Sequence, residues 1–468
     1  MEQQEKFMQM TTAPVGRLIG RLAVPTVVSM LITSVYNMAD TFFVGRLDNT
    51  SATGAVGVVF SLMAIIQACG FLFGQGSGNY ISRMLGQQQR ERAERMAAVG
   101  FFLSLLSGCV ISVLGLAFLD PLARMLGSTE TILPYAREYL RVILLGAPYM
   151  TAAMTLNNQL RFQGSAFYGM IGIGAGGVLN IILDPVFIFG LDMGVVGAAW
   201  ATILSQMVSF VLLLVGCFRG SNLRIRPRLF RPGWADVGEI FRGGFPSLCR
   251  QALASLATIV LNLMAGHFGG DAAIAAMSVA SRIMHLAFAA ILGFGQGFQP
   301  VCGFNYGAGL YARVKEAFWF CVKLGTTLLV VASAAGFVFA PQLVGLFSSD
   351  GAVLEQGAVA LRLQCVSFPL TAWFAMSTML MQTIGRVVPA SFLSMARQGL
   401  FFIPLVIVLP LFIHAFLPAV SPVLGVQLAL PLADVLTSVA AIPLCVRVMG
   451  RYLSDTPSNK GVNLPEET

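Results

Sequence analysis

Apolar stretches long enough to cross a bilayer recur from one end of the 468-residue chain to the other. A membrane-spanning helix needs about 20 mostly apolar residues, because each residue adds 1.5 Å of rise. We predict twelve such spans, with approximate limits 17–44, 55–80, 96–119, 132–160, 167–190, 195–217, 243–266, 272–304, 316–340, 353–380, 390–414 and 423–447. Only 11% of the residues are charged, whereas soluble domains carry about 25%. A transmembrane barrel is rejected because runs such as VVSMLITSVY lack the alternating polarity of barrel strands.

The basic residues are distributed unevenly between the two sides of the predicted membrane. The connections on the side of the two termini hold most of the Lys and Arg, whereas the opposite connections hold Arg46, Arg124, Arg137 and Arg141. Because Lys and Arg concentrate in loops that stay in the cytoplasm, we expect both termini to be cytoplasmic. This distribution accounts for the net charge of +8, so a nucleic-acid partner is not expected.

The two halves of the chain are related by an internal repeat with an offset of 221 residues. At this offset the tetrapeptide FGQG at 73–76 coincides with FGQG at 294–297, Pro25 with Pro246, and Arg92 with Arg313. Six spans per repeat is an even number, so we expect two lobes related by a pseudo-two-fold axis along the membrane normal, as in many transporters. The predicted organisation is an N-terminal lobe at 1–218, a basic cytoplasmic linker at 219–242, a C-terminal lobe at 243–450 and a polar cytoplasmic tail at 451–468.

Three acids, Asp40, Asp184 and Asp434, lie within the predicted spans. On insertion scales a central Asp costs roughly 2.5–3.5 kcal/mol, and such residues commonly mark ion or proton routes. The first half has no basic residue predicted in the membrane interior, so Asp40 and Asp184 must take up a proton or bind a cation.

Asp434 differs from the other two acids because basic residues are predicted at membrane depth in the same half. Arg250, Arg282 and Arg397 lie in second-half spans and could neutralise it. We expect these four residues to form a polar network, which is as compatible with a structural role as with a role in transport.

Local spacing brings further oxygen atoms close to Asp184. Asn180 precedes it by four residues and therefore shares its helix face, and Pro185 removes one backbone donor from the following turn. Counted from the outer ends of their spans, Asp40, Asp184 and Thr202 lie at a similar depth of roughly 8–12 Å. The sequence therefore predicts one exchangeable proton or cation site in the N-terminal lobe.

Three longer stretches carry a family resemblance that extends over essentially the whole chain. They are MADTFFVG at 38–45, LNIILDPVFIFG at 179–190 followed by MGVVGAAWAT at 193–202, and QGFQPVCGFNYGA at 296–308. Together they resemble the MATE (multidrug and toxic compound extrusion) family, and most closely its DinF-like bacterial branch. The resemblance implies a multi-pass antiporter of the bacterial cytoplasmic membrane that exports cationic, amphipathic compounds in exchange for H+ or Na+.

The resemblance also assigns individual residues. The family's helix 1 Asp coincides with Asp40, its helix 5 Asn and Asp with Asn180 and Asp184, and its helix 6 Thr with Thr202. Some branches carry acids in the second lobe, where helix 7 of this chain has Arg250 instead. A second-lobe sodium site is therefore not expected, and the predicted coupling site is confined to the first lobe.

The remaining predictions concern the transport pathway and the partners. Pro25 is expected to kink helix 1, and the expected cavity-lining residues are Met38, Asn157, Gln159 and Gln296. The expected partners are small organic cations and the lipid bilayer, the chain is expected to be a monomer, and neither a cofactor nor a metal other than the coupling ion is expected.

Two alternatives stay open at this point. Arg250, Arg282 and Arg397 would favour a flippase or exporter of a lipid-linked or anionic amphiphile if they faced the cavity. An intramembrane hydrolase is disfavoured, because His267, His285 and His414 are scattered and no GxSxG motif is present.

Overall fold

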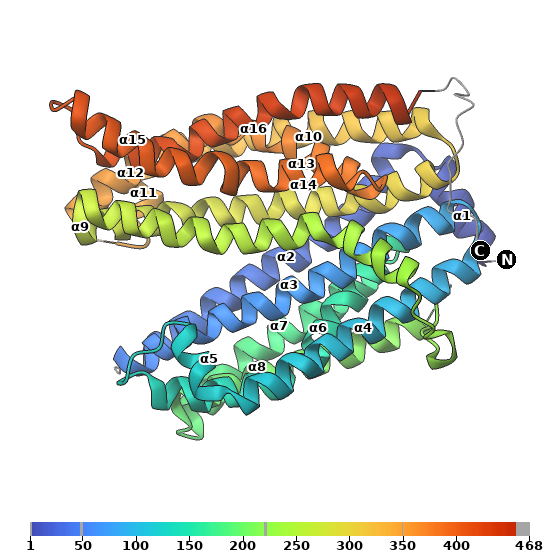
Figure 1. Cartoon of the computed structure of the whole chain (residues 1–468), viewed down its shortest axis with the longest axis horizontal. Helices are drawn as coiled ribbons and strands as arrows, with labels where there is room; N and C mark the ends of the chain where they lie inside the picture. Colours follow the sequence, from blue (N-terminus) through green and yellow to red (C-terminus); the bar gives the residue numbers. More distant parts are fainter. Residues whose placement is uncertain (1, 47–49, 220–221, 349, 455–468) are drawn as a thin grey trace.

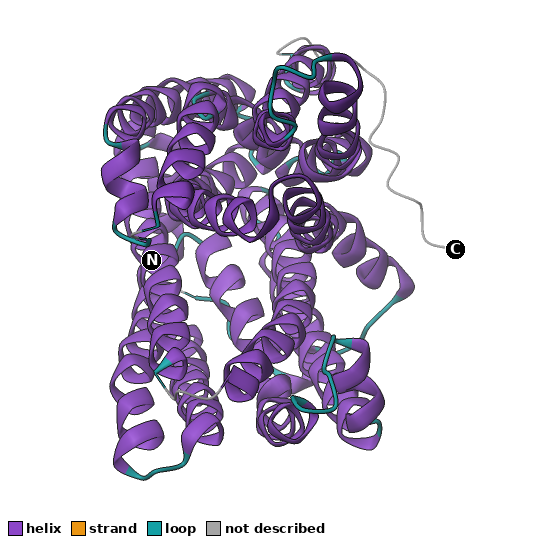
Figure 2. Cartoon of the chain, turned by 90° about the vertical axis from the view of Figure 1, so that its left-hand side faces the viewer, coloured by secondary structure: helices purple, strands orange, loops and turns teal. Residues whose placement is uncertain are grey.

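The computed structural model describes residues 2–46, 50–219, 222–348 and 350–454, and within these ranges all regular structure is helical (Figure 2). The helices of the first half are α1 (Glu2–Thr12), α2 (Val15–Gly45), α3 (Thr50–Gly86), α4 (Arg90–Ala117), α5 (Leu119–Met125), α6 (Leu133–Phe162), α7 (Ala166–Pro185), the π-helix η1 (Val186–Gly190) and α8 (Gly194–Phe218). Those of the second half are η2 (Pro227–Leu229), α9 (Trp234–Gly307), α10 (Tyr311–Val338), α11 (Ala340–Gly345), α12 (Gly351–Ser367), α13 (Leu370–Thr383), α14 (Val387–Met395), the π-helix η3 (Ala396–Phe402), α15 (Ile403–Phe416) and α16 (Val423–Tyr452).

The described helices provide twelve membrane spans. Seven of them are the single helices α2, α3, α4, α6, α8, α10 and α16, and three more are composite: α7 with η1, α14 through α15, and α12 with α13 across a 55° bend. The long helix α9 supplies the last two spans, because Gly270 breaks it with a φ of 63° and a ψ of −158°. Only glycine readily adopts such a conformation. The predicted fold of twelve transmembrane helices is therefore confirmed.

The spans form two lobes, which we call the N-lobe (α2–α8) and the C-lobe (α9–α16). Figure 1 shows the lobes packed together near the described ends of the chain, α1 and the end of α16, at the right of the view, and diverging toward the opposite end. We call the packed end the side of the termini. Seen from that opposite end, the C-lobe helices lie above those of the N-lobe (Figure 2). The predicted linker is only partly a loop, since α9 already begins at Trp234, and residues 455–468 of the predicted tail lie outside the described part of the chain.

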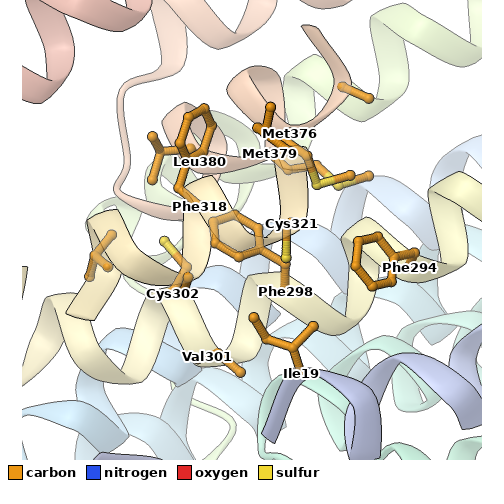
Figure 3. Packing of buried hydrophobic residues seen from close by; sticks show 14 of the residues in the cluster. Ile19, Phe294, Phe298, Val301, Cys302, Phe318, Cys321, Met376, Met379 and Leu380 are labelled. Atoms are coloured by element: carbon orange, nitrogen blue, oxygen red, sulfur yellow. The ribbon is translucent and has the colours of Figure 1, made fainter. Parts of the chain in front are cut away.

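A hydrophobic cluster joins the two lobes on the side of the termini. Ile19 of α2 is completely buried in it and lies near Phe298 and Val301 of α9 (Figure 3). The cluster continues into the C-lobe through Phe318 of α10 and Met379 of α13. The first helix of the N-lobe is thus packed into the core of the C-lobe at this end.

The repeated FGQG tetrapeptide lies at this interface in both lobes. A Cβ atom added at Gly76 of α3 would lie 2.0 Å from the carbonyl oxygen of Ile240 in α9. One added at Gly297 of α9 would lie 2.5 Å from the Cα atom of Ala23 in α2. Small residues allow helices to approach this closely. In each lobe, the second glycine of the FGQG motif therefore allows the first helix of the other lobe to pack closely against it.

Polar contacts reinforce the interface on the same side. Arg83 of α3 donates to the carbonyl oxygen of Thr383 at 2.9 Å and pairs with Glu239 at 3.3 Å. Arg95 of α4 pairs with Asp236 at 2.6 Å, close to the start of α9. The end of the molecule that carries the termini is therefore closed by hydrophobic, glycine-mediated and ionic contacts together.

Candidate functional site

The four residues of the predicted coupling site lie in three helices of the N-lobe. Asp40 is near the end of α2, Asn180 and Asp184 are in the last two turns of α7, and Thr202 is in α8. Asn180 donates from Nδ2 to Asp184 Oδ1 at 3.3 Å, and the two carboxylates interact electrostatically. Asp184 is completely inaccessible to solvent. The structure therefore brings these residues into one region of the N-lobe.

Two tyrosines complete the surroundings of the acids. Tyr139 of α6 is only 2% exposed, lies within electrostatic range of both carboxylates and lies close to Thr202. Tyr36 of α2 lies one turn before Asp40 and close to Gln206 of α8. Sequence reasoning missed both tyrosines. The four-residue spacing between Tyr36 and Asp40 was an available signal, whereas Tyr139 lies in a helix that contributes no other residue to the site.

Three buried oxygen atoms of the site have no hydrogen-bond donor. They are Asp40 Oδ1, Asn180 Oδ1 and Asp184 Oδ2. Among the described residues, no Lys or Arg nitrogen lies within 4.0 Å of either carboxylate. A buried acceptor without a donor costs about 1–3 kcal/mol. The arrangement is therefore deficient in positive charge, which a proton or a small cation would supply.

The helix that carries Asp184 changes its geometry immediately after this residue. Pro185 has no N–H, so the regular pattern of α-helical hydrogen bonds cannot continue through it. The next five residues form the π-helix η1, in which Leu191 N donates to Val186 O at 2.9 Å. π-Helical turns are frequent at functional sites because they leave backbone groups out of the regular ladder. The carboxylate thus lies within one turn of the Ile181 carbonyl, whose usual α-helical donor position is occupied by Pro185.

The acid of the C-lobe has very different surroundings. Asp434 Oδ1 accepts a hydrogen bond from Arg397 Nε at 2.6 Å, and Asp434 Oδ2 accepts one from Ser367 Oγ at 3.0 Å. Arg250 and Arg282, which were predicted to belong to the same network, form no ion pair with any described carboxylate. The structure therefore reduces the predicted four-residue network to the Arg397–Asp434 pair and Ser367.

The predicted cavity-lining residues fall into different environments. Met38 is 47% exposed on α2, and Asn157 is buried with its side-chain oxygen against Gly169 of α7. Gln159 points into the N-lobe core, where its amide donates to Ser77 Oγ at 3.0 Å and to the carbonyl oxygen of Ala97 at 3.1 Å. These bonds hold α6 against α3 and α4, and the assignment of Gln159 to the cavity stays a prediction.

Gln296 lies instead at the interface between the lobes, where its hydrogen-bond partner is Arg161. The predicted span 132–160 would leave Arg161 in the following connection, but α6 extends to Phe162, and the arginine is only 2% exposed. Its guanidinium donates to Gln296 Oε1 across the interface and to Asn158 Oδ1 at 2.7 Å. Gln75, which is related to Gln296 by the repeat, donates to the same Asn158 oxygen at 3.3 Å. Both FGQG glutamines therefore converge on one polar cluster.

Pro25, the predicted kink position, is buried within α2. The helix is continuous from Val15 to Gly45 through this proline. Ser29 Oγ donates to the Pro25 carbonyl oxygen at 2.9 Å. Such a side-chain bond helps a transmembrane helix to accommodate a proline.

Comparison with protein families identifies the chain. A family model described as MatE matches residues 25–186 and again residues 246–408. The chain belongs to the MatE family. The two matches start 221 residues apart, which is the offset of the sequence repeat, so this MATE protein carries the family unit twice. Members of the family are transporters, and the hydrolase alternative is therefore excluded.

Individual relatives cover nearly the full length of the chain. The Multidrug export protein MepA of Staphylococcus aureus is 27% identical over 453 residues, 97% of this MATE protein and 98% of MepA. MepA of Staphylococcus saprophyticus is 28% identical over 389 residues, 83% of this protein and 85% of that one.

Solved structures agree with the two-lobe fold. One is described as the outward-facing conformation of a multidrug resistance MATE family transporter of the MOP superfamily, with a TM-score of 0.89 at 28% identity, covering 95% of this chain and 98% of that one. Another is a MOP superfamily transporter from Pyrococcus furiosus for which a reverse polarity of the binding pocket is said to suggest a different function, with a TM-score of 0.88 at 28% identity, covering 96% and 98%.

Proposed function

We propose that this MATE protein exports cationic, amphipathic compounds in exchange for H+ or Na+, which bind at Asp40 and Asp184 of the N-lobe. The observation that carries the proposal is the group of three buried oxygen atoms without donors, in a site without a neighbouring Lys or Arg among the described residues. The relatives named multidrug export proteins support the export of small molecules, and the cationic character of the substrate rests on the proposal itself.

Transport would proceed by alternating access of the two lobes. The lobes are packed together on the side of the termini, and the excess of basic residues in the connections on that side favours a cytoplasmic location. In this orientation the conformation is closed to the cytoplasm. An ion that arrives from outside at Asp40 and Asp184 disfavours the state that holds a cationic substrate and so promotes its release, and this coupling is reciprocal.

The test uses purified protein in lipid vesicles and the efflux of a fluorescent organic cation, driven separately by a pH gradient or a Na+ gradient. We expect D40N and D184N to reduce gradient-driven efflux about 5- to 150-fold, the range given by coupling free energies of 1–3 kcal/mol. The matched control is D271N, which makes the same chemical change at an exposed position in α9. Undiminished gradient-driven efflux in both site variants would remove the proposed coupling site.

A second candidate function, export of an anionic amphiphile, is supported by a separate observation. Arg161 is buried at the lobe interface within electrostatic range of Arg250, and neither forms an ion pair with a described carboxylate. Against it, Arg397 is already neutralised by Asp434.

The two candidates are separated by a pair of dyes that differ only in an added sulfonate group. The cationic proposal expects the parent dye to be exported and the sulfonated dye to be retained. Export of the sulfonated dye that is lost in R250Q, while D184N leaves it unchanged, would favour the anionic alternative instead.

A further inference from the structure

The short helix α1 lies outside the twelve spans, yet it is attached to both lobes. On the C-lobe side, Asn305 Nδ2 donates to the carbonyl oxygen of Met10 at 3.1 Å, and Arg313 donates to that of Ala13 at 2.7 Å. On the N-lobe side, Lys6 Nζ donates to Ser165 Oγ at 2.7 Å. Figure 1 shows α1 at the end of the molecule where the lobes meet. The helix therefore bridges the closed side of the transporter.

A cavity of about 700 Å³ lies between α1, the first turns of α2 and the connection from α6 to α7. Its lining has two kinds of surface. The cationic residues Lys6 and Arg21 lie on its polar part, and Leu18, Leu22 and Phe167 belong to its apolar part. The cavity is thus amphipathic, with positive charge and apolar surface in one space.

Lys6 and Arg21 of this cavity form no ion pair with a described carboxylate. Lys6 Nζ bonds to the neutral groups of Ser165 and Asn222, the latter at 3.2 Å. No described carboxylate lies within 4.0 Å of Lys6 or Arg21, although Glu5 also lines the cavity. Burial, together with the nearby Arg90, lowers the pKa of Lys6 to about 8. An anionic group in the cavity would relieve this deficit.

The position of the cavity restricts what can supply that anion. It lies where α2 and α7 begin, which is the membrane boundary on the side of the termini. Its apolar residues belong to the spans themselves, and Phe167 is 57% exposed beside it. A small hydrophilic anion would leave this apolar surface uncovered, whereas an amphiphile with an anionic head covers both parts.

We propose that the cavity binds one phospholipid with an anionic headgroup from the adjacent leaflet. Its phosphate is held by Lys6 and Arg21, and its acyl chains lie along Leu18, Leu22 and Phe167. Because α1 is also bonded to the C-lobe, the bound lipid stabilises the state in which the lobes are packed on this side. Such a lipid modulates the conformational equilibrium and is distinct from the transported substrate.

The proposal is tested by offering delipidated full-length protein vesicles of phosphatidylglycerol and phosphatidylcholine in equal amounts and identifying the retained lipid by native mass spectrometry. We expect wild type to retain phosphatidylglycerol preferentially. The double variant K6Q/R21Q should lose about tenfold or more of this preference, as expected for the loss of charge-assisted hydrogen bonds. The matched control is R17Q, which removes an exposed charge one turn earlier on the same helix and outside the cavity.

Two further measurements keep the outcome interpretable. R21Q alone is included because Arg21 takes no part in the described hydrogen bonds of α1, so a loss of preference in this variant is due to lipid binding and not to detachment of the helix. Equal retention of both lipids by wild type, or an unchanged preference in R21Q and in the double variant, overturns the proposal. Displacement of the lipid by soluble glycerol phosphate at equal concentration would show a site for free phosphate and overturn it as well.

Discussion

Asp434 and Asp184 are both buried aspartates at membrane depth, but the chain treats them differently. Both oxygens of Asp434 accept hydrogen bonds, one of them from the guanidinium of Arg397, which also stacks against Phe288 with 4.9 Å to the ring centroid. In Asp184, Oδ2 has no hydrogen-bond donor, and Oδ1 accepts a hydrogen bond from the amide of Asn180. A satisfied pair of this kind is a structural feature, whereas an unsatisfied acid remains available to an exchangeable ion.

Replacing Arg397 tests whether the pair of Arg397 and Asp434 stabilises the fold. R397M leaves the carboxylate of Asp434, which is 2% exposed, buried without its cation, and we expect a loss of about 3–5 kcal/mol in the free energy of unfolding. R397M/D434N should recover most of this loss, since the second change removes the uncompensated charge. Chemical unfolding in detergent measures both.

D40N is the matched comparison, because it neutralises an acid that we propose to bind an exchangeable ion. Asp40 has no ion-pair partner among the described residues, so we expect no comparable loss of stability when it becomes an amide. An unaltered stability of R397M, or a loss in D40N as large as in R397M, would contradict the distinction between a structural and an exchangeable acid.

At the residue scale, the sequence identified the acids but not all of their surroundings. Apolar length predicted the spans, and the cost of buried charge singled out Asp40 and Asp184. Tyr139 was missed because only the packing of α6 against α7 and α8 brings it to the site. Arg161 was misplaced because its helix extends further than hydropathy indicates. The bonds of Gln159 to α3 and α4 were not foreseen, because a sequence does not show which neighbouring helix a polar residue in a span bonds to. A sequence pattern predicts the depth of a residue in the membrane and the helix face on which it lies. It does not predict which residue of another helix it contacts.

At the scale of elements, the closed side of the transporter depends on glycines where helices of different lobes cross. Gly76 of α3 admits the backbone of Ile240, and Gly303 of α9 admits Ser82, whose Oγ would be 2.0 Å from an added Cβ atom. The interface is therefore held by close backbone approach as much as by hydrophobic contact. Even one added methyl group would alter the separation of the lobes.

G76A is expected to shift the protein away from the state closed on the terminus side. Overpacking of this kind costs about 1–3 kcal/mol, which corresponds to a 5- to 150-fold change in the population of the open state. The measurement is the rate at which a membrane-impermeant thiol reagent labels S82C, since Ser82 is completely buried in the closed interface. The background rate is taken from the same protein without the introduced cysteine.

The control for this experiment is G57A on the same helix. A Cβ atom at Gly57 would meet no atom within 4 Å, so the substitution should leave labelling unchanged and slightly favour the helix. Equal labelling rates in G76A and G57A would show that the close approach at Gly76 does not limit the separation of the lobes.

At the scale of the whole molecule, α1 couples the two lobes through a lysine whose charge is poorly compensated. Lys6 has its pKa lowered to about 8 by burial and by Arg90, from an ordinary value of 10.5. When α1 is detached, Lys6 is solvated and holds its proton up to the ordinary pKa. Between these two values the detached state binds more protons than the attached one, so attachment of α1 becomes more favourable as the pH rises from about 8 toward 10.5. Below pH 8 the cost of burying the charged amine is fully present.

This dependence is measured by the mobility of a spin label at position 8, since Met8 is exposed on α1, in lipid-free detergent between pH 7 and pH 10. We expect the label to become less mobile as the pH rises in wild type and to show no such trend in K6M, which lacks the titrating group. Added phosphatidylglycerol should move the transition to higher pH, because an anion at Lys6 stabilises its protonated form. A transition that persists in K6M, or one that phosphatidylglycerol leaves in place, would separate the attachment of α1 from the charge of Lys6 and remove the link between the bridging helix and the lipid.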